Sequence, residues 1–285
     1  MVVMSRRIIL IASKVPYVYQ PETTAYMTAV GIPDDGTIYY SSTAYEITGS
    51  AMWLAIDNLC IAFKTALSLP LGVSNLNTVF DTYYPAIGGT STSCKWNLID
   101  PQDTDSAMRL TFSGGWTFGA NGMTPNGTNS YANTHWNSTA KAGATRVAFG
   151  GYKQGNGTLG IYGSWDLNNN TRLYHFGSSS VFTINGTSNA GNTDLRSCSV
   201  ILNSSNVKMF DRDGLIDTYA STTLSLCSIP FYLGARNNNN ASINQYSNMP
   251  ISTYWLTGKV ELTQTQAIAI NSAIDQFNVE LLRNV

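Results

Sequence analysis

The chain has 285 residues, of which 12% are charged and 11% are aromatic, and its net charge is -1 at pH 7. That length supports one large folded domain, or one domain with a small appendage, and the composition excludes a disordered chain. A net charge near zero gives no long-range attraction to nucleic acid or to an anionic membrane. No run approaches the roughly 18–20 apolar residues that span a bilayer. We therefore expect neither nucleic acid nor a membrane as a partner.

Residues 1–80 are predicted to form an N-terminal arm and a small helical region. The arm, residues 1–21, has a basic pair and a short apolar run like a secretion signal, but the run is too short and lacks a clear cleavage site. A first strand or an assembly arm that docks on a neighbouring chain fits better. One helix is expected over Pro21–Met27 with its stop at Gly31. A longer one is expected over Glu46–Lys64, with a one-sided apolar stripe formed by Met52, Ile56, Leu59 and Phe63.

From about Asp81 the apolar pattern changes to a period of two, which is typical of strands. Asn-Gly pairs tolerate the positive φ that tight hairpins need, and they begin at Asn121, Asn126, Asn156 and Asn185. Many short strands with such turns predict a sandwich or barrel. The predicted strands are Arg109–Ser113, Ser130–Thr134, Thr145–Phe149, Leu159–Trp165, Arg172–Phe176, Val181–Asn185, Ser197–Leu202 and Val207–Phe210.

The last part of the chain has the clearest local signals. Residues 207–216 are two β runs joined by an Asp-Gly turn, which predicts a hairpin. Another strand is expected over Pro230–Arg236. A final helix begins near Leu262, where Thr263 and Gln266 have the spacing of a capping box. The whole pattern predicts a mainly β chain, with an antiparallel jelly-roll β-sandwich over residues 81–285 that ends in a helix.

Several short motifs resemble those of a known family. They are the Asp-Gly hairpin, then Leu233-Gly234-Ala235-Arg236-Asn237, then the Leu262-Thr263 start of the last helix. With Trp96–Pro101, Arg109–Trp116 and Pro125–Ala132, they resemble concanavalin A-like (laminin G-type) jelly-roll proteins of tailed-bacteriophage virions. The resemblance runs from about Pro21 to Arg283 and implies a capsid decoration, head fibre or tail fibre. One departure is Asp213-Gly214 where Asn-Gly is expected.

The sequence predicts no catalytic residue. Sugar hydrolysis commonly needs two nearby carboxylates, yet no glutamate lies between Glu46 and Glu261, and no aspartates have a paired spacing within a strand. The two histidines, His135 and His175, belong to no Ser/His/Asp or metal-binding pattern, so we expect structural roles for them. We therefore predict that the chain is not an enzyme.

Two candidate binding regions remain, and each has a plainer alternative. Asp211, Asp213 and Asp217 offer the oxygen ligands that calcium prefers, or they only build the hairpin turn; no other cofactor is expected. Exposed aromatic rings and side-chain amides are suited to sugars, or the rings lie in the core and the amides form a solvated loop. The candidate ligand-binding residues are Arg236, Asn237, Asn238, Asn239, Asn240 and Trp255.

The four cysteines match no zinc or redox motif. One interpretation is that all four are separate buried thiols. The other is that Cys198 and Cys227 form a single disulfide.

The favoured prediction is a structural virion protein of a tailed phage, assembled in the host cytoplasm. Its partners would be other virion proteins, further copies of itself and host-surface glycans. The alternatives are a free carbohydrate-binding lectin and, third, a glycoside hydrolase or polysaccharide lyase.

Overall fold

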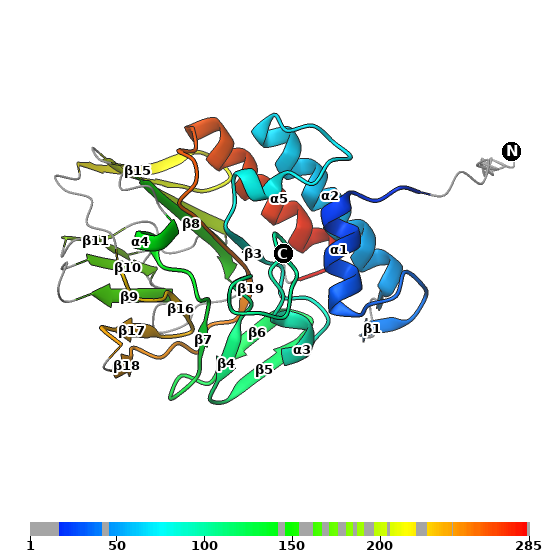
Figure 1. Cartoon of the computed structure of the whole chain (residues 1–285), viewed down its shortest axis with the longest axis horizontal. Helices are drawn as coiled ribbons and strands as arrows, with labels where there is room; N and C mark the ends of the chain where they lie inside the picture. Colours follow the sequence, from blue (N-terminus) through cyan, green and yellow to red (C-terminus); the bar gives the residue numbers. More distant parts are fainter. Residues whose placement is uncertain are drawn as a thin grey trace, which may run out of the picture.

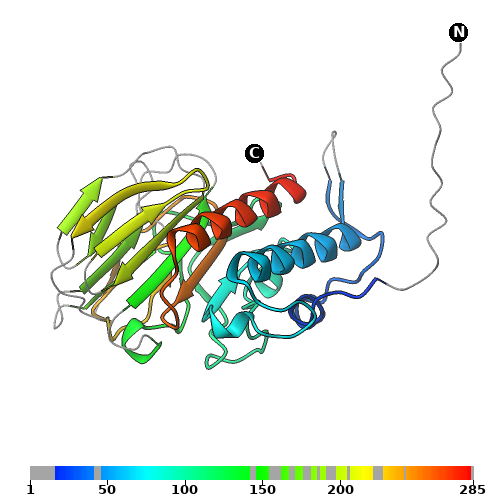
Figure 2. The ribbon, with the colours of Figure 1, turned by 90° about the horizontal axis from the view of Figure 1, so that it is seen from above.

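Two β-sheets pack face to face, and helices cover the outer side of one of them (Figures 1 and 2). The computed structural model describes residues 17–41, 46–141, 146–153, 162–166, 171–175, 181–184, 187–190, 197–203, 206–220, 227–240 and 242–283. Within these ranges the chain is a mainly β sandwich with largely antiparallel pairing, N-terminal helices and a C-terminal helix. The predicted fold class is confirmed.

The first sheet has eight strands in the described ranges, and β19 is near its centre. On one edge β19 pairs with β8, and on the other with β3 and β6. The strands in spatial order are β15 (Leu215–Ala220), β14 (Asn206–Phe210), β13 (Ser197–Asn203), β8 (Arg146–Lys153), β19 (Ile251–Thr257), β6 (Gly122–Pro125) and β5 (Trp116–Gly119), with β3 (Thr82–Tyr84) beside β19.

The second sheet has seven strands in the described ranges, and its pairs are antiparallel except for β17 with β9. Its strands in spatial order are β18 (Ser242–Asn244), β17 (Arg236–Asn238), β9 (Tyr162–Asp166), β16 (Tyr232–Leu233), β7 (Tyr131–Asn133) and β4 (Thr111–Ser113), with β10 (Thr171–His175) paired to β9. Two smaller pairs are β1 (Ile38–Ser41) with β2 (Glu46–Thr48), and β11 (Val181–Ile184) with β12 (Thr187–Ala190).

Successive side chains of the first sheet enter two different cores, because neighbouring strand residues point to opposite faces. Every residue of β19 is buried. Tyr254 stacks on Phe231 in the core between the two sheets, whereas Trp255 meets Phe80 edge-on in the core under the helices. This strand is therefore covered on both faces.

Three long helices form the outer layer: α1 (Pro21–Val30), α2 (Gly49–Leu67) and α5 (Gln264–Glu280). In Figure 2, α5 lies on the first sheet and α2 runs alongside it. The predicted stripe of α2 is buried, and Gly31 ends α1 with φ +76. Thr263 and Gln266 form the predicted capping box of α5. Three short helices are η1 (Leu76–Thr78), α3 (Ser91–Cys94) and α4 (Ser138–Lys141).

The helical region and the sandwich share one hydrophobic core. Ile56 of α2, Ile270 of α5 and Trp255 of β19 belong to the same buried cluster, so the core does not divide at residue 80. Whether residues 1–80 dock on a neighbouring chain stays a prediction. Among the described residues, no helix has both the length and the apolar character to cross a bilayer.

The end of the chain is fastened into the sandwich by Arg283. Its buried guanidinium donates to the backbone carbonyls of Ala120, Pro85, Ser252 and Ala86, at 2.8–3.1 Å. Ala120 lies in the turn between β5 and β6, where the predicted Asn121-Gly122 hairpin is found. The Asn-Gly pairs at Asn156 and Asn185 lie outside the described residues. So does the side chain of Cys198, which leaves untested the choice between four separate thiols and a Cys198–Cys227 disulfide; Cys60, Cys94 and Cys227 are buried.

Candidate ligand-binding face

The outer face of the seven-stranded sheet carries a row of aromatic, amide, hydroxyl and guanidinium side chains. Strand register places them on one face, on the two sides of β9, since residues directly opposite each other share a face. The alternate residues Ala132, Leu233 and Asn237 are buried. The opposed outer pairs are Ser113 with Tyr131, Asn133 with Tyr232, Arg236 with Asn244, and Asn238 with Ser242. We call these eight residues the outer-face row.

Two tyrosines form the aromatic part of the row. The rings of Tyr131 and Tyr232 stack with centroids 4.9 Å apart and planes 14° apart, and both are half-buried. Burial raises the pKa of the Tyr232 hydroxyl, and neighbouring Tyr131 adds to that increase. Tyr232 therefore stays a neutral hydroxyl that both donates and accepts hydrogen bonds, next to a flat apolar surface.

The polar part of the row is ordered by its own hydrogen bonds. Arg236 Nε donates to Asn244 Oδ1 at 2.6 Å, and Asn238 Nδ2 donates to Ser242 Oγ at 3.0 Å. These contacts restrict the rotamers of four side chains, so less conformational entropy remains to be lost when a ligand binds.

His135 lies at the edge of this face, beside β4. Its Nε2 is 2.8 Å from Thr111 Oγ1 and 3.4 Å from Asp105 Oδ1. Burial lowers the pKa of His135; Asp105 opposes that shift and Arg109 adds to it. The ring is therefore a neutral hydrogen-bonding group near pH 7, and the structural role expected for it stays a prediction. The His175 side chain is outside the described residues.

The predicted asparagine loop is a hairpin, β17 and β18, and its four asparagines have three different placements. Asn238 points outward with Arg236. Asn237 is buried, where its amide donates to Pro230 O and to Asn240 Oδ1. Asn239 and Asn240 form the turn, with φ of +57 and +54, a conformation that asparagine tolerates better than most residues.

Trp255 does not belong to this face. Its ring is fully buried under the helices, with its centroid 5.6 Å from that of Phe80. The sequence suggested a sugar-stacking ring, but Trp255 lies in the core because β19 is covered on both sides. Trp136 is also buried, Trp116 is partly buried against Phe112 and Phe118, and the side chain of Trp165 is not described.

The three aspartates proposed for calcium do not form a metal-binding group. In the described part of the chain, no cluster of three or more His, Cys, Asp or Glu side chains is arranged to hold a metal ion. Asp211 Oδ1 instead accepts from the backbone N–H groups of Asp213 and Gly214, each at 2.8 Å, and Asp217 Oδ1 accepts from Thr218 N. The plainer alternative, an Asp-built hairpin turn, describes the contacts observed.

Two other groups of neighbouring carboxylates each contain an arginine. Arg109 lies 2.9 Å from Asp103 and 3.2 Å from Asp105. Arg212 lies 3.3 Å from Asp275 and 3.8 Å from Asp213. Lys95 and Arg109 lower the pKa of Asp103, whereas burial of Asp275 outweighs Arg212 and raises the pKa of Asp275 to about 6.

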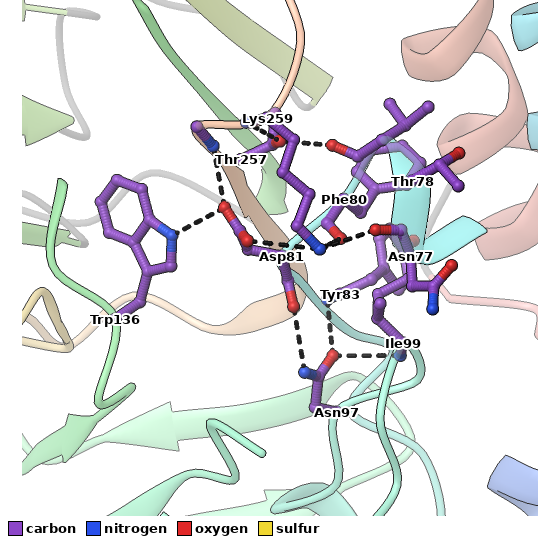
Figure 3. Close-up of polar contacts among 12 residues, drawn as sticks. Asn77, Thr78, Phe80, Asp81, Tyr83, Asn97, Ile99, Trp136, Thr257 and Lys259 are labelled. Carbon is purple, nitrogen blue, oxygen red and sulfur yellow. Dashed lines mark hydrogen bonds and ion pairs between the residues drawn. The ribbon is translucent and has the colours of Figure 1, made fainter. Parts of the chain in front are cut away.

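Asp81 is the centre of a buried polar cluster that the sequence did not reveal (Figure 3). Its Oδ2 accepts from Trp136 Nε1 at 3.1 Å and Gly258 N at 2.8 Å, and its Oδ1 lies 3.5 Å from Lys259 Nζ. Lys259 Nζ also donates to the carbonyls of Asn77 and Phe80. A pocket of about 470 Å³ opens beside this cluster. Because both charged groups already have several partners, we assign the cluster a structural role.

The sequence prediction missed Ser113, Ser242 and Asn244 of the row, and it also missed Tyr131, Asn133 and Tyr232. The signal for the last three was the alternation Tyr131-Ala132-Asn133 and Tyr232-Leu233, in which every second residue is apolar and buried. The register that joins these two strands has no counterpart in the local sequence.

Comparisons with known proteins gave only distant structural likenesses. No family model and no curated protein matches the chain. Among solved structures, the Ruminococcus gnavus IT-sialidase CBM40 bound to α2,6-sialyllactose is 16% identical with a TM-score of 0.35, over 48% of this chain and 87% of that one. Botulinum neurotoxin type C is 14% identical with a TM-score of 0.45, and the match covers 71% of this chain and 53% of the neurotoxin chain. The NanB sialidase of Streptococcus pneumoniae is 11% identical with a TM-score of 0.38, and the match covers 55% of this chain and 27% of the sialidase chain. The chain thus spans well under two thirds of the latter two proteins.

Proposed function

We propose that this chain is a non-catalytic structural protein of a tailed-phage virion, and that it presents a glycan-binding face outward. It would serve as a capsid decoration or as part of a head or tail fibre. The observation that carries the glycan part of the proposal is the outer-face row, in which a stacked tyrosine pair on β7 and β16 shares one sheet face with ordered amide and hydroxyl groups on β17 and β18.

The chemistry of the row matches that of a sugar. A pyranose ring has an apolar C–H surface that fits an aromatic ring, and its rim of hydroxyls both donates and accepts hydrogen bonds. Amides and hydroxyls do the same. Ligand sites typically combine aromatic surface with a few placed polar groups, and Tyr131, Tyr232, Asn133 and Asn238 supply that combination.

The layer order supports an outward orientation of this face. The helices cover the eight-stranded sheet, so the outer face of the seven-stranded sheet points away from them (Figure 1). A chain fixed to a particle through its helical side would therefore leave the outer-face row accessible. The assignment to a virion is supported by the sequence resemblance from Pro21 to Arg283.

A glycan array probed with the purified chain tests the binding role. Wild type is expected to bind a defined subset of glycans, and Tyr232→Ala to lose at least tenfold in affinity, about 1.4 kcal/mol. Tyr39→Ala is the matched control, since Tyr39 is a half-buried tyrosine of β1 outside both large sheets. Equal loss in both variants, or no binding by wild type, would contradict the proposal.

Locating the chain in intact particles tests the virion role separately. We expect the chain in density maps and in mass spectra of purified virions. Selective glycan binding by a chain that is absent from particles would instead favour a free lectin. Turnover of a polysaccharide, lost when one aspartate is changed, would favour an enzyme.

A further inference from the structure

A buried lysine, glutamine and glutamate meet where α1 begins. Lys64 of α2 lies with its Nζ 3.0 Å from Gln20 Oε1 and 2.8 Å from Glu22 Oε2, and its third proton is directed at Val73 O, 2.8 Å away. Lys64 is fully buried, and Glu22 and Gln20 are 4% and 8% exposed. One amine thus contacts both a carboxamide and a carboxylate, with little access to water.

The carboxamide is held in the orientation that makes its carbon electrophilic. Gly72 N–H donates to Gln20 Oε1 at 2.8 Å, and because a backbone N–H only donates, the atom that faces it is the oxygen. Lys64 and Gly72 therefore both donate hydrogen bonds to the same carbonyl oxygen, Gln20 Oε1. A backbone N–H aimed at a carbonyl oxygen also stabilises the negative charge that forms there when a nucleophile adds to the carbon.

Glu22 is fixed as the proton acceptor. Its Oε1 accepts from the backbone N–H groups of Asn75 at 2.8 Å and Leu76 at 3.2 Å, which directs Oε2 to Lys64. Burial raises the pKa of Glu22, but the hydrogen bonds from Lys64 and from the backbone outweigh it and leave the pKa below its ordinary value. The resting pair is therefore ionic, and the amine becomes nucleophilic only when a proton moves to Glu22.

We propose that Lys64 and Gln20 join in an intramolecular amide bond, with Glu22 carrying the protons. Lys64 Nζ gives a proton to Glu22 Oε2, and its lone pair attacks Gln20 Cδ. The oxyanion forms on Oε1, facing Gly72 N–H. The bond from Cδ to Nε2 then breaks, and the leaving nitrogen takes the proton from Glu22 and a second proton from Nζ. It departs as ammonium, Glu22 is again a carboxylate, and no oxidant, reductant or cofactor takes part.

The reaction needs only one slow turnover in each molecule, because the amine and the amide are already in contact and the site has little access to water. The product would be a covalent link between the N-cap residue of α1 and the last turns of α2. Tension applied to the residues before Tyr17 would then pass directly into α2. This proposal does not depend on glycan binding.

Intact mass spectrometry of the full chain, purified and kept for days at 37 °C, tests the proposal. Wild type is expected to be lighter than its sequence by one ammonia, and a digest should contain a branched peptide that joins Gln20 to Lys64. Glu22→Gln, which keeps the side-chain size but removes the proton acceptor, should remain at full mass. Lys64→Arg should also remain at full mass.

Asn-Gly sites are the competing source of ammonia loss, and Lys64→Arg serves as their control. A matching loss in Lys64→Arg would assign the missing ammonia to a site such as Asn121 and overturn the proposal. Full mass in aged wild type, or a digest in which Gln20 and Lys64 occur only in separate linear peptides, would overturn it as well. The wild-type digest decides the question even where a variant fails to fold.

Discussion

The indole N–H of Trp136 donates to the carboxylate of Asp81 at 3.1 Å, and this bond connects the two cores of the protein. Trp136 belongs to the core between the sheets, whereas Phe80, adjacent to Asp81, belongs to the core under the helices. The same carboxylate oxygen accepts from Gly258 N, directly after β19. One buried acid thus ties the sandwich, the helical layer and the path into α5 together.

Replacing Asp81 with asparagine is expected to destabilise the protein. The amide oxygen can still face Trp136 and Gly258, but the amide N–H₂ then faces Lys259, donor against donor. We expect a loss of about 1–3 kcal/mol in the free energy of unfolding, measured by urea titration. Asp100→Asn, in the wall of the same pocket, is the control and should change stability by less than about 0.5 kcal/mol. Equal effects of the two variants would count against a central role for Asp81.

Arg283→Met should lower the free energy of unfolding more than Asp81→Asn does. It removes the four hydrogen bonds that the Arg283 guanidinium donates to backbone carbonyls. One of these carbonyls belongs to Ala86, whose φ of +48 is unfavourable for a residue with a Cβ. We expect a loss of about 3–5 kcal/mol, seen as a lower urea midpoint. Lys95→Ala, which removes an ion pair with the exposed Asp103, should have little effect. A midpoint unchanged in Arg283→Met would refute this assignment.

Asp275 should make the stability depend on pH between about 4 and 6. Burial raises its pKa from 3.8 to about 6; Arg212 opposes the shift, and Asp213 and Asp211 add to it. The folded state therefore binds a proton at Asp275 more tightly than the unfolded state does. Protonation of Asp275 thus stabilises the folded state fully below pH 4, and this stabilisation is lost as pH rises through 6. Its Oδ1 is also buried without a hydrogen-bond partner.

Asp275→Asn is accordingly expected to raise the Tm at pH 7.5 by about 2–6 °C. At pH 4 the wild type should match it, since Asp275 is then neutral. Differential scanning fluorimetry across this range measures both values. A Tm difference that does not change with pH would show that Asp275 titrates normally.

Asn239 offers a test of turn conformation that is separate from ligand binding. Because its φ is +57, Asn239→Gly should leave stability within a few tenths of a kcal/mol, whereas Asn239→Val should cost about 1–2 kcal/mol. Thermal unfolding distinguishes the two substitutions. Equal stability of both variants would mean that residue 239 adopts negative φ in solution.

Elements governed by local chemistry were predictable from the sequence. The capping box at Thr263, the stop at Gly31 and the Asp-Gly hairpin each depend on contacts within a few residues, and all three were found. The β runs predicted from the alternating pattern also correspond to strands wherever the structure describes them. The strand predicted over Pro230–Arg236 is interrupted, because Gly234 has φ +79 and separates β16 from β17.

What the sequence did not reveal depends on register and burial. Trp255 and the outward tyrosines are all aromatic residues in strands, and the packing of the helices and Phe80 on the first sheet decides that Trp255 is covered. The Lys64, Gln20 and Glu22 cluster joins residues up to 44 positions apart, and Arg283 reaches Pro85 across 198. No local pattern encodes such contacts.

The position of β19 has a consequence for synthesis on the ribosome. Its neighbours β3, β6 and β8 all precede it in the chain by about a hundred residues or more. In a nascent chain, the edges of these three strands that pair with β19 would therefore stay unpaired until β19 emerges. Sheet edges exposed in this way promote aggregation. Chains truncated before Met249 should therefore accumulate with chaperones or in inclusion bodies, even though most of the sandwich sequence is already present.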